Sequence, residues 1–279
     1  MYVFKLIPSS IIPNSVTLAH GGPEVDRPKD KATHTQPGRF IVGSIGGHVS
    51  QRWPMSAVPW GTPIRLNARK ELEVQLRGGW VLLSTLPGWK ERYPNNPAGA
   101  TAAFTQAYNS LMLYERASVY GLPSQDKMPA PWNGQFPKTW VLNDFGRVAI
   151  KYFVDHNGNR KLDGKEYLLS DFIHTTPNEE LETLISKKIT PLGPMKLSES
   201  HGCIHMIPEV LQDWIARKVL VVGATIEVHP YSEASIPATF ERKAGRVGTE
   251  IHFYPKAQGL ALYRVTKKQV GLPLHARHG

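Results

Sequence analysis

Short β-type segments separated by glycine and proline turns occupy most of this chain and limit its fold class. The 279 residues include 24 glycines and 23 prolines, which interrupt regular helices and strands. Segments such as SVTLAHGG (Ser15–Gly22) and GRFIVGS (Gly38–Ser44) make residues 1–83 a series of strands and turns. Strands are expected to resume at Lys138–Asp144 and Arg147–Asp155. We therefore expect a mainly β protein with helical insertions.

Three segments are expected to be helical. Asn96–Ser118 is rich in Ala, Leu and Met, which favour helices. Pro177–Ile189 has proline and acids in its first turn and lysines near its end. Ile207–Leu220 places its apolar residues on one helical face.

The positions of the glycine and proline turns also predict the domain boundaries. We expect one domain over residues 1–230, interrupted by a helical insertion at about residues 85–137, and a β-rich C-terminal extension over residues 231–279. A chain of this length can bury a full hydrophobic core.

The charge balance narrows the possible partners. Lys and Arg exceed Asp and Glu by 33 − 23 = 10, which favours polyanionic partners. The basic residues are scattered and match no recognition-helix or zinc-finger pattern, so no nucleic-acid partner is expected.

No apolar run approaches the roughly 18 to 20 residues that span a bilayer, so no membrane span is expected. Pro8 and Pro13 break the apolar N-terminus, and no signal peptide is visible.

The chain contains one cysteine, Cys203, within SESHGCIHM (Ser198–Met206). A single thiol forms no internal disulfide, which leaves packing, metal binding or chemistry. His201 and His205 lie two residues to either side, so all three side chains share one face of an extended segment. Gly202 lets the backbone approach a substrate oxygen closely.

Upstream, DFIHTTP places His174 at the end of a β-type stretch, where a general base commonly lies. Two alternatives remain at this point. A lone cysteine is most often a small buried hydrophobe, and His201, Cys203 and His205 could instead bind zinc with His174 as fourth ligand.

SHGCIHM (Ser200–Met206) closely resembles the signature of the L,D-transpeptidase (YkuD-type) catalytic domain, Ser/Thr-His-Gly-Cys followed by an apolar residue. Three further stretches are similar to landmarks of that family and occur in its order. They are THTQPGRFIV (Thr33–Val42), FIHTT (Phe172–Thr176) and GATIEV (Gly223–Val228). The resemblance implies a β-sandwich or barrel catalytic domain that acts on peptidoglycan stem peptides.

The resemblance also implies a role for each residue of the site. Cys203 would attack the carbonyl that precedes a terminal D-amino acid, and the acyl-enzyme would pass to an amine or to water. His174 matches the general base, His201 the histidine that shapes the site, and Ser200 its hydrogen-bonding support. The N–H groups of Gly202 and Cys203 would hold the oxyanion. His205, where many members carry arginine or asparagine, would donate to a substrate carboxylate.

No cofactor or metal is expected for this reaction, and the expected partners are peptidoglycan stem peptides. The expected location is the periplasm or cell wall. Because no signal peptide is visible, a variant is a toxin delivered by a dedicated secretion system into the periplasm of a rival. Such a toxin would have secretion machinery and an immunity protein as partners.

Two other functions stay open. In an NlpC-type amidase the base follows the nucleophile, so His229 or His252 would replace His174. Alternatively, the chain is a non-catalytic β-rich binding module with a buried thiol.

A second motif, DHNGNRKLDGKE (Asp155–Glu166), has the acid and amide spacing of a calcium loop without its central glycine. A polar hairpin tip explains the same residues.

Overall fold

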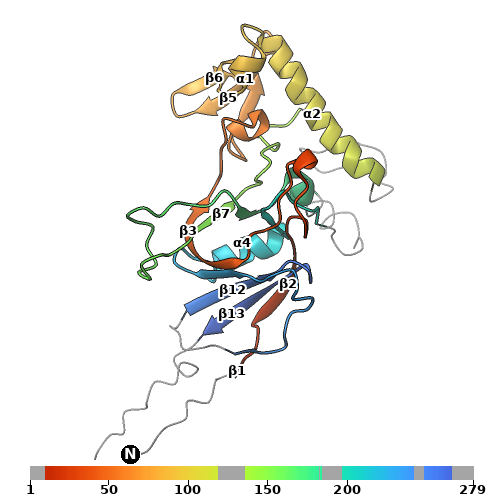
Figure 1. Cartoon of the computed structure of the whole chain (residues 1–279). Helices are drawn as coiled ribbons and strands as arrows, with labels where there is room; N and C mark the ends of the chain where they lie inside the picture. The colour runs from red at the N-terminus through yellow and green to blue at the C-terminus, as the bar shows by residue number, and fades with distance from the viewer. Residues whose placement is uncertain (1–9, 119–135, 182, 184–196, 242–247, 266–279) are drawn as a thin grey trace, which may run out of the picture.

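The computed structural model describes residues 10–118, 136–181, 183, 197–241 and 248–265 (Figure 1). Its centre is a closed barrel. In order around the barrel, the strands are β10 (Thr225–Val228), β12 (Gly248–Tyr254), β13 (Gly259–Val265), β2 (Ser15–His20), β9 (Ile204–Met206), β8 (Phe172–His174), β7 (Ala149–Phe153) and β3 (Gly38–Gly46). Two neighbouring pairs, β10–β12 and β8–β9, run parallel. The expectation of a mainly β fold is confirmed.

The barrel surrounds one apolar core. Alternate residues of each strand point inward, and Ile173 of β8 and Ile204 of β9 are completely buried there. Helix α4 (Pro208–Ala216) adds Leu211 and Trp214 to the same core. Each such side chain stabilises the fold by about 1.5–3 kcal/mol relative to an exposed position. The predicted amphipathic helix over residues 207–220 is thus confirmed, although it ends earlier.

A second lobe is inserted between β3 and β7, and we call residues 54–118 and 136–142 the upper lobe (Figure 1). It contains the three-stranded sheet β4 (Ile64–Leu66), β5 (Leu72–Leu76) and β6 (Gly79–Leu82), the helices α1 (Trp89–Arg92) and α2 (Pro97–Ser118), and the 3-10 turns Pro54–Ala57 and Leu83–Thr85. A third 3-10 turn, Pro28–Asp30, follows β2. The predicted helix over residues 96–118 is confirmed by α2. The insertion begins well before residue 85, because β4, β5 and β6 pair with one another and not with the barrel.

Two tryptophans organise the core of the upper lobe. The indole N–H of Trp89 donates to the Pro54 carbonyl at 2.7 Å, and that of Trp140 donates to the Met55 carbonyl at 2.8 Å. Trp140 belongs to the segment expected as a strand at residues 138–144. The structure shows no strand there, only a bridge between Thr139 and Pro63 with backbone hydrogen bonds on either side of it. Trp140 itself is buried in the upper-lobe core.

The described residues 248–265, which belong to the C-terminal extension expected over residues 231–279, contribute two strands to the barrel itself. β12 pairs with β10, and β13 pairs with β12 and with β2. Without these two strands β10 and β2 would both be open edges. The short strands β1 (Ser10–Ile11) and β11 (Phe240–Glu241) form a separate pair.

Residues 177–181 and 183 are helical, as expected for the start of the helix at 177–189, and the rest of that segment lies outside the described residues. None of the helices in the described part of the chain combines the length and apolar character that a bilayer crossing requires.

Candidate active site

The parallel pair β8–β9 brings the cysteine motif beside the upstream histidine. Ile173 pairs with Ile204, and His174 pairs with His205. Because the isoleucines face the barrel core, the alternating residues Cys203, His205 and His174 face away from it. The Phe172 N–H donates to the Cys203 Sγ at 3.4 Å. Residues 31 positions apart in the chain thus meet on one outer face.

The cysteine loop is closed by Ser200. Its hydroxyl donates to the Cys203 carbonyl and accepts a hydrogen bond from the Gly202 N–H at 3.1 Å. The Gly202 N–H therefore already has a partner, unlike the open oxyanion donor that the resemblance implies. Of the two expected donors, this leaves the Cys203 N–H for that role in our proposal.

Gly202 is required by its surroundings. Its φ of +132° lies in a region that favours glycine, and an added Cβ would lie 2.8 Å from Thr33 Oγ1 and 3.1 Å from Asp171 Oδ1. The Thr33 N–H and hydroxyl donate to the His201 carbonyl at 3.3 and 3.0 Å. The turn at Thr33 thus holds the cysteine loop through the His201 backbone, while His201 itself is exposed.

His174 has the form of a general base. It is 4% exposed, and its Nδ1 lies 2.8 Å from the Thr175 carbonyl. A carbonyl only accepts, so Nδ1 carries the proton and Nε2 keeps its lone pair. Burial, followed by the proximity of His205, lowers the pKa of His174 to about 3, so the imidazole is neutral at physiological pH.

His205 lies against a glutamate that the sequence did not single out. Its Nδ1 lies 3.0 Å from Glu179 Oε1 and 3.2 Å from Ser198 Oγ. Its ring meets that of His174 edge-on, with centroids 4.8 Å apart. The sequence indicates the acid at 179 only as part of a helix start, but its side chain is buried and faces the site. One ring nitrogen of His205 therefore has partners within the protein, which leaves at most Nε2 for a substrate carboxylate.

The thiol is not held as a thiolate in this structure. Although the residue as a whole is partly exposed, burial of the sulfur raises the pKa of Cys203 to about 12. The Phe172 N–H opposes that shift, and Asp171 adds to it. His174 is itself neutral, so it supplies no positive charge that would stabilise the thiolate.

Asp171→Asn is expected to make Cys203 more reactive. The substitution keeps the shape of the side chain but removes the negative charge that raises the pKa of the thiol. The rate of alkylation by iodoacetamide is followed from pH 6 to 10 by intact mass. As the pH is raised, this rate should begin to increase at a lower pH in Asp171→Asn than in the parent. Asp213→Asn, an exposed change on α4, is the control. Identical profiles for Asp171→Asn and the parent would contradict this assignment.

Aromatic rings line the site next to His174. Phe145 lies with its ring centroid 5.2 Å from His174 and 5.5 Å from Phe172. His48 meets the rings of Phe145 and Phe172 edge-on at 4.4 and 4.8 Å. Burial, with a smaller effect of Lys151, lowers the pKa of His48 to about 4. This wall is therefore neutral.

The two later histidines form a separate cluster. His229 Nε2 lies 3.0 Å from His252 Nδ1, and both side chains are buried. They belong to the β10–β12 part of the barrel, where β13 and β2 separate β12 from β9. Glu227, Glu250 and His252 have possible ligand atoms within 4.8 Å of one another, and this group, among the described residues, does not include Cys203. Arg39 forms ion pairs with both glutamates and so already supplies their counter-charge.

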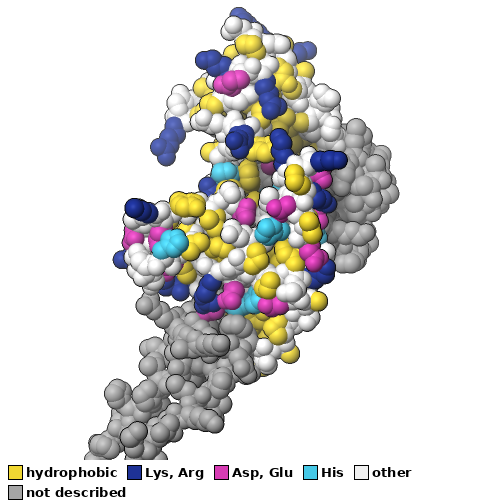
Figure 2. All heavy atoms as spheres, viewed as in Figure 1, with side chains coloured by type: hydrophobic (Ala, Val, Ile, Leu, Met, Phe, Trp, Pro, Cys, Tyr) yellow, Lys and Arg dark blue, Asp and Glu magenta, His cyan; other side chains and the backbone are white. Residues whose placement is uncertain are grey.

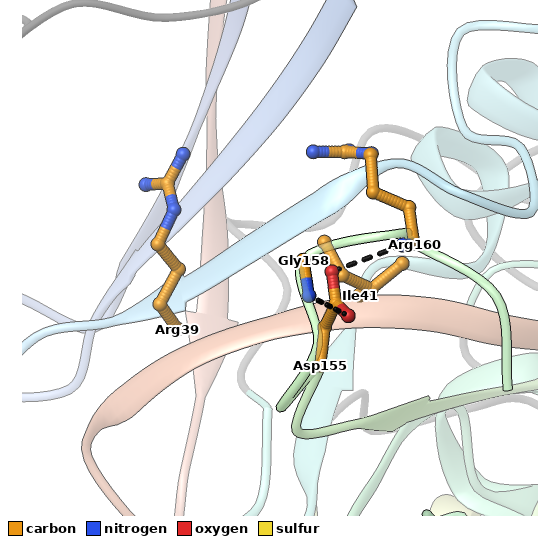
Figure 3. A pocket seen from close by; sticks show the side chains of 5 residues that line it. All are labelled: Arg39, Ile41, Asp155, Gly158 and Arg160. Carbon is orange, nitrogen blue, oxygen red and sulfur yellow. Dashed lines mark hydrogen bonds between the residues drawn. The ribbon is translucent and has the colours of Figure 1, made fainter. Parts of the chain in front are cut away.

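A cavity of about 350 Å³ lies beside the loop at residues 155–166 and is lined by Arg39, Ile41, Asp155, Gly158 and Arg160 (Figure 3). Asp155 accepts from the N–H groups of Gly158 and Arg160 at 2.9 and 3.0 Å. Asn157 and Asn159 donate to the Asp163 carboxylate at 2.9 and 2.7 Å. The loop's own donors thus use these carboxylates, as in the polar hairpin tip that was the alternative to a calcium loop.

Comparison of the chain with protein-family models, with curated proteins and with solved structures found no match.

Proposed function

We propose that this protein is a peptidoglycan-modifying cysteine enzyme of the L,D-transpeptidase type. The observation that carries the proposal is the parallel pairing of β8 and β9, which gathers Cys203, His174 and His205 on one outer face of the barrel. The turn that begins at Thr33 lies against the cysteine loop, and β10 pairs with β3. The four stretches that resemble the family are therefore neighbours in space.

In this proposal the thiol is deprotonated during the attack and not before it. The substrate carbonyl carbon forms a bond with Sγ while His174 Nε2 accepts the thiol proton. The oxyanion is stabilised by the Cys203 N–H. The tetrahedral intermediate collapses to a thioester as His174 returns the proton to the departing amine of the terminal D-amino acid. An amine or a water molecule then attacks the thioester, loses its proton to His174, and releases the thiol.

The surface suits an anionic partner. Figure 2 shows Lys and Arg side chains prominent on the upper lobe, in a chain with a net charge of +10. Cell-wall polymers carry negative charge, and a basic protein associates with them faster. The proposed location is accordingly the periplasm or cell wall. In the variant delivered to a rival cell, an immunity protein and a secretion machine would be further partners.

The NlpC-type alternative requires His229 or His252 as the base. The hydrogen bond between these two histidines and their place at β10 and β12 favour His174 instead. The binding-module alternative requires a thiol that never reacts. Acylation of Cys203 distinguishes an enzyme from a binding module. A raised thiol pKa slows simple alkylation but leaves acylation possible when a base accepts the thiol proton.

The test incubates the protein with a disaccharide-tetrapeptide and reads the products by mass spectrometry. We expect loss of the terminal D-amino acid, exchange for an added D-amino acid, or a cross-linked dimer. A carbapenem should add its full mass to the protein once. Cys203→Ala should lose all of these signals. A Cys203→Ala protein that processes the muropeptide like the parent would overturn the proposal.

A further inference from the structure

A chain of hydrogen bonds runs from His174 to an arginine near the upper lobe. His174 donates from Nδ1 to the Thr175 carbonyl at 2.8 Å. The Thr175 hydroxyl lies 2.8 Å from Glu180 Oε1, and the Arg147 Nε lies 2.6 Å from Glu180 Oε2. Thr175 and Glu180 are 1% and 3% exposed. The connection is therefore buried up to the arginine.

The direction of every bond in this chain is fixed. Arginine has only donors and the ionised carboxylate only acceptors, so Glu180 must accept from both Arg147 and Thr175. Because the Thr175 hydroxyl donates its hydrogen bond to Glu180, the rotamer of Thr175 is held. The next residue along the path, His174, can only donate to the Thr175 carbonyl. The tautomer of His174 thus follows from the position of one peptide group.

The surroundings leave Thr175 little room to move. A Cβ on Gly146, at φ +59°, would come within 1.9 Å of Thr175 Oγ1 and 2.8 Å of the Thr175 carbonyl oxygen. The Arg147 guanidinium lies over the Trp60 ring of the upper lobe at 5.5 Å. Leu181, next to Glu180, is buried in the upper-lobe core. The upper lobe therefore packs on the residues that hold the peptide group.

We propose that Arg147, Glu180 and Thr175 are positioning residues that fix His174 in its Nδ1–H tautomer, with Nε2 directed away from the Thr175 carbonyl as the basic atom. This inference rests on the proposed function for its kinetic consequences. It gives the inserted upper lobe a role in catalysis, because Trp60 and Leu181 support Arg147 and Glu180. Neither Arg147 nor Glu180 needs to touch the substrate.

The test compares Thr175→Val, which removes the hydroxyl, with Thr175→Ser, which keeps it. For Thr175→Val we expect kcat to fall about 10- to 100-fold, as a small misplacement of a catalytic group does, with KM nearly unchanged. Thr175→Ser should retain most of the parental kcat. Glu73→Gln is the matched control. It removes the charge of Glu73 on β5 from its ion pair with Arg65 on β4, away from the path between His174 and Arg147.

A second readout does not depend on activity. Long-range ¹H–¹⁵N spectra report which ring nitrogen of a histidine carries the proton, and the His174 signals are assigned by their loss in His174→Gln. We expect a single Nδ1–H form in the parent and in Thr175→Ser, and a mixture in Thr175→Val. An unmixed Nδ1–H form with parental kcat in Thr175→Val would overturn the positioning role.

The two proposals fail separately. A parent protein that leaves muropeptides unchanged would refute the proposed function, while the spectra would still decide the tautomer. If Thr175→Val does not fold, Arg147→Lys replaces it. That change keeps the charge but loses the planar guanidinium, and an unaltered tautomer and kcat there would count against the inference.

Discussion

His174→Gln is expected to slow acyl-enzyme formation by about 10²- to 10⁴-fold, the usual contribution of a general base. In our proposal the Nε2 lone pair of His174 accepts the thiol proton, and glutamine has no basic atom to replace it. Single-turnover acylation by a carbapenem, read by intact mass, measures this step directly. If His174→Gln is acylated at the parental rate and only its multiple-turnover rate falls, His174 is not the base for Cys203.

Two other histidines make this experiment specific. His156→Gln changes an exposed ring on the loop at residues 155–166 and should leave acylation at the parental rate. His229→Gln discriminates between enzyme classes, because an NlpC-type mechanism would place the base there. Loss of activity in His229→Gln but not in His174→Gln would replace our assignment with that alternative.

Acid is expected to destabilise the protein strongly through the same histidine. The pKa of His174 is lowered to about 3 in the folded protein, against about 6.5 in the unfolded chain. Above pH 6.5 both states are neutral, and the full stability is present. As the pH falls below 6.5, the unfolded state takes up a proton that the folded state refuses, so stability falls by about 1.4 kcal/mol per pH unit. Down to pH 3 the loss is roughly 5 kcal/mol.

Urea unfolding at pH 7.0, 6.0 and 5.0 measures this slope, because most carboxylates stay ionised in that range. His174→Gln should show a shallower dependence than the parent. The lowered pKa values of His48 and His229 act in the same direction as that of His174. The raised pKa values of Asp144 and Asp171 act in the opposite direction. The difference between the two proteins isolates His174, and parallel curves would refute its burial as a neutral base.

Local patterns in the sequence were sufficient for several elements. The helix formers over residues 96–118 and the apolar face of residues 207–220 predicted α2 and α4. The alternation in SVTLAHGG and the β-type residues of GRFIVGS predicted β2 and β3. These predictions succeed because helical and strand periodicity depends on residues close in the chain.

The partners of His174 and Cys203 could not be read in the same way. In the sequence, Asp171 and Thr175 lie in the β-type stretch DFIHTTP around His174, and Glu179 and Glu180 lie in the acidic start of a helix. Their importance comes from burial next to two histidines, and burial depends on how distant strands pair. The placement of β12 and β13 inside the barrel follows from the same kind of long-range pairing.

The sequence by itself therefore determined the mainly β character, the two helices and the residues around Cys203 that resemble a catalytic motif. Only the tertiary structure decided the protonation chemistry of the site. The pKa of a thiol or an imidazole depends on the water and charge removed around it, and that environment is assembled from β8, β9, the turn at Thr33 and the helix that starts at residue 177. No window of sequence contains all four.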